Sequence, residues 1–337
     1  MFFVILRTMS NPYTLLRRAA AVRSPRLKLI GAWLLAATGR RYVGVFLDPV
    51  LGCNLRCLMC YFSDPVRRAE LHGRMTAEQL ERLAARLFPR ALKLQIGCGA
   101  EPTLYKALPE VVALGKKHGV PYVSITTNGQ LLTDALLREL IAAGLDEVTL
   151  SLHGLTRATY EELMPGARFD RFEELCGALA AAKADSPALR IRLNYTMNSR
   201  NTAELALLPD LLQSLPADVV QLRPVQRIGD SAWQDFSTRA VRENYDSLLR
   251  PLATRLKEEG VTVLMPDVAD LDALDTAPSP VEAALHRLTY LNVEPAAADV
   301  AAPPRLSLRE LVRALLGRGQ AASDARPTTK KLAYRIR

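Results

Sequence analysis

Three cysteines in one short segment are the residues of this chain with the clearest chemical potential. Cys53, Cys57 and Cys60 form a C-x3-C-x2-C pattern directly after a strand-like run. Three closely spaced thiolates can ligate three irons of a [4Fe–4S] cluster. No fourth cysteine follows at short spacing, so one iron would stay open to another ligand. An open iron is a position where chemistry can occur.

Two other uses of these cysteines have to be weighed. Three cysteines and a nearby histidine such as His72 could form a structural zinc site, although such sites usually pair two short cysteine knuckles. A disulfide framework is disfavoured, because only five cysteines occur in 337 residues and no convincing signal peptide precedes them. The cysteine usage therefore predicts a reducing compartment, and we expect a cytoplasmic protein.

The cysteine spacing resembles the signature of the radical S-adenosylmethionine (SAM) family. The resemblance covers about residues 43–228 and is closest to the branch that often carries a cysteine-rich C-terminal domain. That domain is absent, since no cysteine follows Cys176, so we expect a single cluster. Met59 stands where the family usually has an aromatic residue.

The resemblance implies a specific chemistry and specific cofactors. Cys53, Cys57 and Cys60 would ligate a [4Fe–4S] cluster, and S-adenosyl-L-methionine would chelate the open iron. The reduced cluster would cleave SAM to a 5′-deoxyadenosyl radical that abstracts hydrogen from a substrate. An external electron donor such as flavodoxin or ferredoxin would be a partner.

The rest of the chain alternates between strand-like and helix-like stretches, which predicts an α/β fold with a parallel sheet and right-handed crossovers. The resemblance implies a partial (β/α)6 barrel of the TIM type, with helical N-terminal and C-terminal extensions. The six expected strands span residues 43–47, 91–96, 122–126, 147–152, 189–196 and 218–222.

Domain limits follow from this pattern. We expect a basic N-terminal extension (1–41), a barrel (42–228), a C-terminal extension of helices and a strand (229–320) and a basic tail (321–337). Within the C-terminal extension, residues 261–265 resemble a further strand, residues 280–288 a helix and residues 295–304 a linker rich in alanine and proline.

Polar and glycine-rich motifs follow the strands, where sites of βα barrels are built. Gly97-Cys98-Gly99-Ala100-Glu101-Pro102 resembles the family's G-G-E-P turn, which contacts the SAM amino group. The turn around Asn128 resembles the family's T-N-G motif. The residues expected to bind the cofactor are Gly99, Ala100, Glu101, Asn128, Ser151 and Asn194.

Two further side chains are candidates for catalysis or substrate contact. Cys98 lies beside the Glu101 turn, and His153 stands where related proteins commonly have an aspartate. More ordinary alternatives are a small packed thiol and a structural histidine. Gln221 and Arg223 alternate onto one strand face, and polar groups on such a face are costly unless they have partners.

Charge is concentrated at the two ends. Residues 1–47 carry +8 and residues 321–337 carry +4, whereas the chain as a whole carries +9. The body between them is therefore slightly acidic. The basic ends could meet an acidic partner, RNA or an anionic surface, or remain solvated tails. No apolar run is long enough for a transmembrane helix.

Three functional hypotheses result. The first is a radical SAM enzyme acting on an unidentified peptide, protein or small metabolite. The second is a radical SAM enzyme that modifies RNA. The third is a non-catalytic metal-binding barrel.

Overall fold

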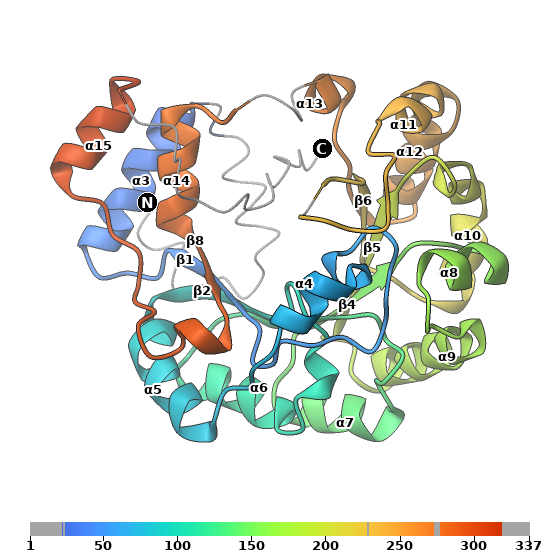
Figure 1. Cartoon of the computed structure of the whole chain (residues 1–337), viewed down its shortest axis with the longest axis horizontal. Coiled ribbons are helices and arrows are strands. Elements are labelled where there is room, and N and C mark those ends of the chain that lie inside the picture. The colour runs from blue at the N-terminus through green and yellow to red at the C-terminus, as the bar shows by residue number, and fades with distance from the viewer. Residues whose placement is uncertain (1–21, 23, 228, 273–276, 319–337) are drawn as a thin grey trace.

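The computed structural model describes residues 22, 24–227, 229–272 and 277–318. One open, parallel sheet of eight strands forms its centre, in the order β7-β6-β5-β4-β3-β2-β1-β8. Helices cover the outer face of this curved sheet, and its concave face opens to one side (Figure 1). The strands are β1 (Val43–Leu47), β2 (Ala91–Ile96), β3 (Val123–Thr127), β4 (Glu147–Leu152), β5 (Arg190–Met197), β6 (Val219–Pro224), β7 (Thr262–Leu264) and β8 (Tyr290–Val293).

The predicted α/β partial barrel is confirmed, but its strand count is corrected from six to eight. The six expected strands lie within two residues of β1–β6, and the stretch 261–265 contains β7. Strand β8 was not predicted; it pairs in parallel with β1. Only Val293 of its four residues is buried, so the segment lacks the apolar alternation by which strands are found in a sequence.

The helices have the start signals that the sequence contains. Thr76 and Ser307 form capping boxes in which side chain and backbone satisfy each other. The helices are α3 (Pro25–Ala37), α4 (Pro65–Glu70), α5 (Ala77–Leu87), α6 (Leu108–Lys117), α7 (Asp134–Ala142), α8 (Arg157–Leu163), α9 (Phe169–Asp185), α10 (Leu208–Ser214), α11 (Arg239–Glu243), α12 (Arg250–Glu258), α13 (Val268–Asp272), α14 (Pro280–Thr289) and α15 (Leu308–Leu315).

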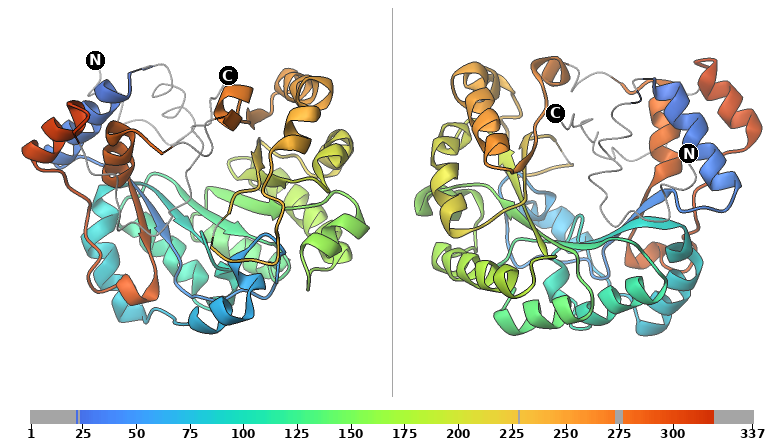
Figure 2. Two further views of the ribbon diagram at one scale, coloured as in Figure 1. Left: turned by 45° about the horizontal axis from the view of Figure 1, so that its top comes forward. Right: turned by 180° about the vertical axis from the view of Figure 1, so that it is seen from behind.

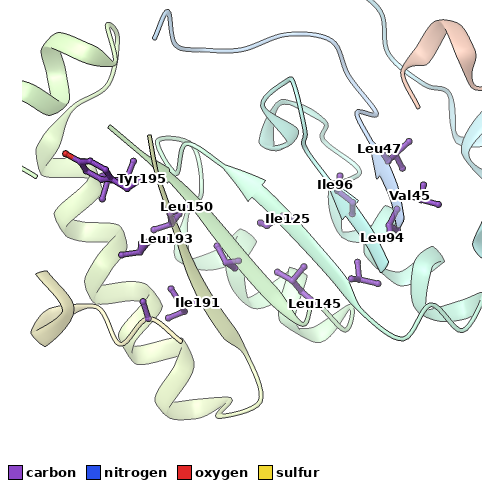
Figure 3. Packing of buried hydrophobic residues seen from close by; sticks show 14 of the residues in the cluster. Val45, Leu47, Leu94, Ile96, Ile125, Leu145, Leu150, Ile191, Leu193 and Tyr195 are labelled. Carbon is purple, nitrogen blue, oxygen red and sulfur yellow. The ribbon is translucent and has the colours of Figure 1, made fainter. Parts of the chain in front are cut away.

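The hydrophobic core lies between the sheet and its outer helices. Strand residues that alternate onto this face are buried, including Ile125, Leu150, Ile191 and Leu193 (Figure 3). Cys176 of α9 packs in the same core. The opposite strand face is largely polar, apart from a small cluster of Tyr122, Val219 and Leu264 and the stacked rings of Phe46 and Tyr290.

The C-terminal extension is built into the barrel. Helices α3, α14 and α15 lie together at one edge of the molecule, away from α11 and α12 (Figure 2). The Trp33 indole N–H donates to the Leu306 carbonyl at 2.9 Å, and the Tyr42 hydroxyl donates to the Pro304 carbonyl. Residues 295–304, expected to be a linker, are packed rather than loose.

Asp299 shows why the linker prediction is wrong. Its carboxylate accepts from Arg82 at 2.8 Å and from Gln79 at 2.9 Å, both on α5. Such long-range partners cannot be read from local composition. The basic residues before 22 and the basic tail after 318 lie outside the described residues. Among the described residues, no helix is long and apolar enough to cross a membrane.

Candidate active site

The three-cysteine segment is a loop that follows β1 and is fastened to the segment after α8. The backbone N–H groups of Arg56 and Leu58 donate to the carbonyls of Pro165 (2.9 Å) and Leu163 (3.0 Å). The loop also turns on itself, because the Cys60 N–H donates to the Cys57 carbonyl at 2.9 Å. These bonds hold the loop in one shape without using a cysteine sulfur.

The three thiols are covered and electrostatically coupled. Burial raises the pKa of Cys57 well above its usual range, and the neighbouring Cys60 and Cys53 raise it further. Burial likewise raises the pKa of Cys53 to about 11. Three adjacent thiolates are therefore unfavourable without a cationic partner, and iron supplies one because metal coordination deprotonates a thiol. The donor set fits an iron–sulfur cluster with three protein ligands.

The zinc alternative has no support from the geometry. His72 is exposed on the loop after α4. Among the residues that the structure describes, no three or more His, Cys, Asp or Glu side chains converge as ligands of one ion. Thiolates of a [4Fe–4S] cluster do not need to converge in this way, since each binds a different iron.

Glu101 is buried at the end of β2 and joins three motifs. Its carboxylate accepts from the Thr103 and Thr127 hydroxyls, each at 2.6 Å, and from the Asn128 N–H at 2.9 Å. Its own N–H donates to the Gly52 carbonyl beside the cysteine loop at 2.8 Å. Burial raises its pKa, and these donors act against that shift. Glu101 therefore organises the neighbouring turn as well as offering a carboxylate.

The turn before Glu101 is held by Asp48, which the motif analysis did not identify. The Asp48 carboxylate accepts backbone N–H bonds from Cys98 (2.8 Å), Gly99 (3.1 Å) and Ala100 (3.3 Å). Burial raises the pKa of Asp48 to about 6, and the three N–H groups act in the opposite direction. The signal in the sequence was an acidic residue directly after the first buried strand.

Tyr61 also holds the turn before Glu101. Its hydroxyl donates to the Gly99 carbonyl at 2.7 Å, and a Cβ at Gly99 would lie 2.3 Å from the Tyr61 hydroxyl. Glycine is therefore required there by close approach. Ala100 replaces a glycine of the resembling motif without strain, because no described non-glycine residue has a positive φ.

Asn128 links the third strand to the cysteine loop. Its side-chain amide donates to Asn54 Oδ1 at 2.9 Å. The same amide nitrogen makes a longer hydrogen bond to Cys53 Sγ, at 3.8 Å. The predicted residues Cys53, Glu101 and Asn128 therefore form one connected network.

The other predicted residues lie in rows across the concave face. The strand register aligns Ser151 with Asn194 and Asn194 with Gln221. Asn194 accepts from Arg192 Nε at 2.9 Å. Ser151 and Asn194 thus share a row, but among the described residues no hydrogen bond joins either side chain to the cysteine loop.

The two candidate catalytic residues differ in environment. The Cys98 side chain is exposed. His153 follows β4, and its Nδ1 is buried without a hydrogen-bond partner among the described residues. Burial and, to a smaller extent, the nearby Arg223 charge lower the pKa of His153 to about 4, so the imidazole is neutral at physiological pH.

Comparison with known proteins agrees with this site. A family model described as the Radical SAM superfamily matches residues 48–194, from Asp48 through Asn194. Residues 48–194 of this chain belong to the radical SAM superfamily. The family uses a [4Fe–4S] cluster and SAM, so the predicted cofactors are those of the family.

Relatives with curated names match only part of this chain. The probable GTP 3′,8-cyclase of Saccharolobus solfataricus is 32% identical over 177 residues, covering 52% of this chain and 55% of its own. The GTP 3′,8-cyclase of Chlorobaculum tepidum is 37% identical over 160 residues, covering 47% and 46%. The chain thus spans about half the length of these relatives.

A solved structure extends the fold comparison. Streptococcus suis SuiB bound to S-adenosylmethionine superposes with a TM-score of 0.58 and 17% identity, over 75% of this chain and 58% of SuiB. At this identity the likeness supports the fold alone.

Proposed function

We propose that this chain is a radical SAM enzyme that uses one [4Fe–4S] cluster to cleave S-adenosyl-L-methionine reductively. The observation that carries the proposal is the network that joins Cys53 through Asn128 to Glu101. This network places the cysteine thiols, which would bind the cluster, next to the buried Glu101 carboxylate, which would bind the amino group of SAM.

Each part of the network has a role in this proposal. Cys53, Cys57 and Cys60 hold the cluster and leave one iron open. Glu101 and the carbonyls of the Gly99–Ala100 turn accept hydrogen bonds from the SAM ammonium, because an ammonium needs acceptors and a counter-charge. When bound, the reduced cluster supplies the electron that breaks the carbon–sulfur bond of SAM.

The remaining residues exclude water and fix positions. Asp48 and Tyr61 keep the turn before Glu101 in one conformation. Asn128 orients the cysteine loop. Ser151 and Asn194 offer hydroxyl and amide groups to the polar parts of SAM from the adjacent strands. An external reductant of the flavodoxin or ferredoxin class would deliver the electron.

Fewer features of the chain bear on the cellular compartment and on the two alternative functions. All five cysteines are free, which supports a reducing, cytoplasmic location. The RNA-modifying alternative depends on the basic ends, which lie largely outside the described residues. A non-catalytic barrel would not require a buried carboxylate beside the cysteine loop.

Electron paramagnetic resonance of the anaerobically reconstituted, reduced chain tests the proposal. We expect about four irons and four sulfides per chain and a signal that changes when SAM is added, because SAM binds the open iron. Stoichiometric zinc without iron, or a cluster signal that SAM leaves unchanged, would contradict it.

A further inference from the structure

Three side chains form a row across the concave face, beyond the row that contains Ser151 and Asn194. The register pairs Thr196 with Arg223, and His153 follows β4 two residues after Ser151, on the same face. Two residues of strand rise about 7 Å. Beyond this row, Asn198, two residues after Thr196, donates from Nδ2 to Met59 Sδ of the cysteine loop at 3.1 Å, so the row lies between that of Ser151 and the cysteine loop.

Arg223 differs from the other cations of this face. Lys93 has the Glu147 carboxylate 3.5 Å away, and Arg192 bonds to the side chain of Asn194. Arg223 donates from Nε to Thr196 Oγ1 at 3.3 Å. Among the described residues, no carboxylate forms an ion pair with it.

The position of Arg223 is fixed by the sheet. Val220 and Leu222, its neighbours by alternation, are fully buried against the outer helices, so Arg223 projects onto the concave face. Its positive charge acts on His153 and also on Tyr290 of β8, at the other edge of the sheet. A guanidinium presents its N–H groups as a planar fork that matches carboxylate and phosphate oxygens.

His153 supplies a second, independent observation. Its Nδ1 is buried and has no hydrogen-bond partner among the described residues, and a polar atom in that state is costly unless a ligand satisfies it. A neutral imidazole can donate from Nδ1 in one tautomer. Arg223, Thr196 and His153 together offer a charge, a hydroxyl and an unsatisfied ring nitrogen.

We propose that the substrate of this enzyme carries an anionic group, a phosphate or a carboxylate, which Arg223 binds with Thr196 and His153 beside it. The inference rests on the proposed radical SAM function, since it assigns the substrate class of that site. It assigns the anion to the substrate and not to SAM, because Glu101, Ser151 and Asn194 already meet the polar groups of SAM in the proposed function.

The test is a calorimetric titration of the reconstituted, SAM-bound full chain with inorganic pyrophosphate and, separately, with succinate. We expect at least one probe to bind, and Arg223→Gln to weaken that binding about ten- to hundred-fold, the scale of a lost charged hydrogen bond. Arg239→Gln on exposed α11 is the matched control and should bind as the wild type does. Binding of pyrophosphate alone would assign a phosphate, and binding of succinate alone a carboxylate.

The same preparations separate this inference from the proposed function. Iron content and SAM affinity report on the cluster and SAM, whereas the anion titration reports on Arg223. Unchanged SAM affinity in Arg223→Gln supports the substrate assignment, and equal melting temperatures show that the variant is folded. The inference is overturned if neither probe binds, if binding is the same in Arg223→Gln, or if this variant loses SAM affinity.

Discussion

At the scale of single residues, the site is one network that joins the cysteine loop to Glu101 through Asn128. Cys53, Glu101 and Asn128 were identified from their motifs, and the structure brings them into one network. Asp48 and Tyr61 were missed, because their roles depend on backbone groups about 40–50 residues away. No local pattern encodes such a contact.

Glu101 gives the first residue prediction. Glu101→Gln keeps the shape of the side chain but removes the charge opposite the SAM ammonium. We expect SAM affinity to fall about ten- to hundred-fold, the scale of a charged hydrogen bond, while iron content is unchanged. Calorimetric titration with SAM measures this affinity, and the control is Glu110→Gln, a change at an exposed residue of α6. Equal SAM affinity in both variants would show that Glu101 only organises the turn.

Asp48 gives a pH-dependent prediction. Its pKa is raised to about 6 by burial, so the protonated form favours the folded state. The stabilisation that the protonated Asp48 contributes is complete below about pH 4. It is lost as pH rises through about 6 and stays absent at higher pH. Relative to Asp48→Asn, the wild type should lose up to about 3 kcal/mol of unfolding free energy across this window.

Urea unfolding of the cluster-free chain at pH 4, 5, 6 and 7 measures this difference. A difference that stays constant, or that moves in favour of the wild type as pH rises, would contradict the prediction. The latter result would mean that the three backbone N–H bonds to Asp48 outweigh the cost of its burial.

At the scale of elements, strands with strong apolar patterns were predictable and the edge strand β8 was not. β1, β2 and β4 begin and end as predicted, since each has apolar residues at alternate positions that are buried against the outer helices. β8 is held instead by its pairing with β1 and by the helices packed around it. The C-terminal extension is consequently part of the barrel and not a separate appendage.

Leu288 tests this integration. It is fully buried on α14, which packs against α3 and β1. Leu288→Ala should lower the unfolding free energy of the whole chain by about 2–5 kcal/mol, in one cooperative transition. Val300→Ala is the control, because Val300 is 79% exposed and should change stability by no more than about 0.5 kcal/mol. A separate early transition confined to the extension would refute the integration.

At the scale of the whole molecule, charge and chemistry are separated. The basic ends account for the net positive charge, with +8 in residues 1–47 and +4 in residues 321–337 against +9 for the whole chain, whereas the cysteine loop, Glu101 and Arg223 belong to the barrel. The ends lie largely outside the described residues, so their role rests on the sequence alone. The concave face has its own excess of cations, which composition did not reveal because it depends on strand register.

Removing residues 321–337 tests this separation. The truncated chain should retain full SAM cleavage, because no residue of the proposed site is removed. It should elute from a heparin column at lower salt than the full chain, since +4 of charge is lost and attraction between exposed charges is screened by salt. Loss of cleavage in a folded, cluster-loaded truncation would show that the tail belongs to the catalytic body.

The most direct measurement is the amount of 5′-deoxyadenosine that the reduced, reconstituted chain forms from SAM. The reaction is run under anaerobic conditions, and the product is quantified by chromatography. We predict that the wild type forms it. Cys57→Ser should form none, while its melting temperature stays close to that of the cluster-free wild type. A wild-type chain that holds four irons yet forms no 5′-deoxyadenosine, or a Cys57→Ser variant that forms as much as the wild type, would contradict the account.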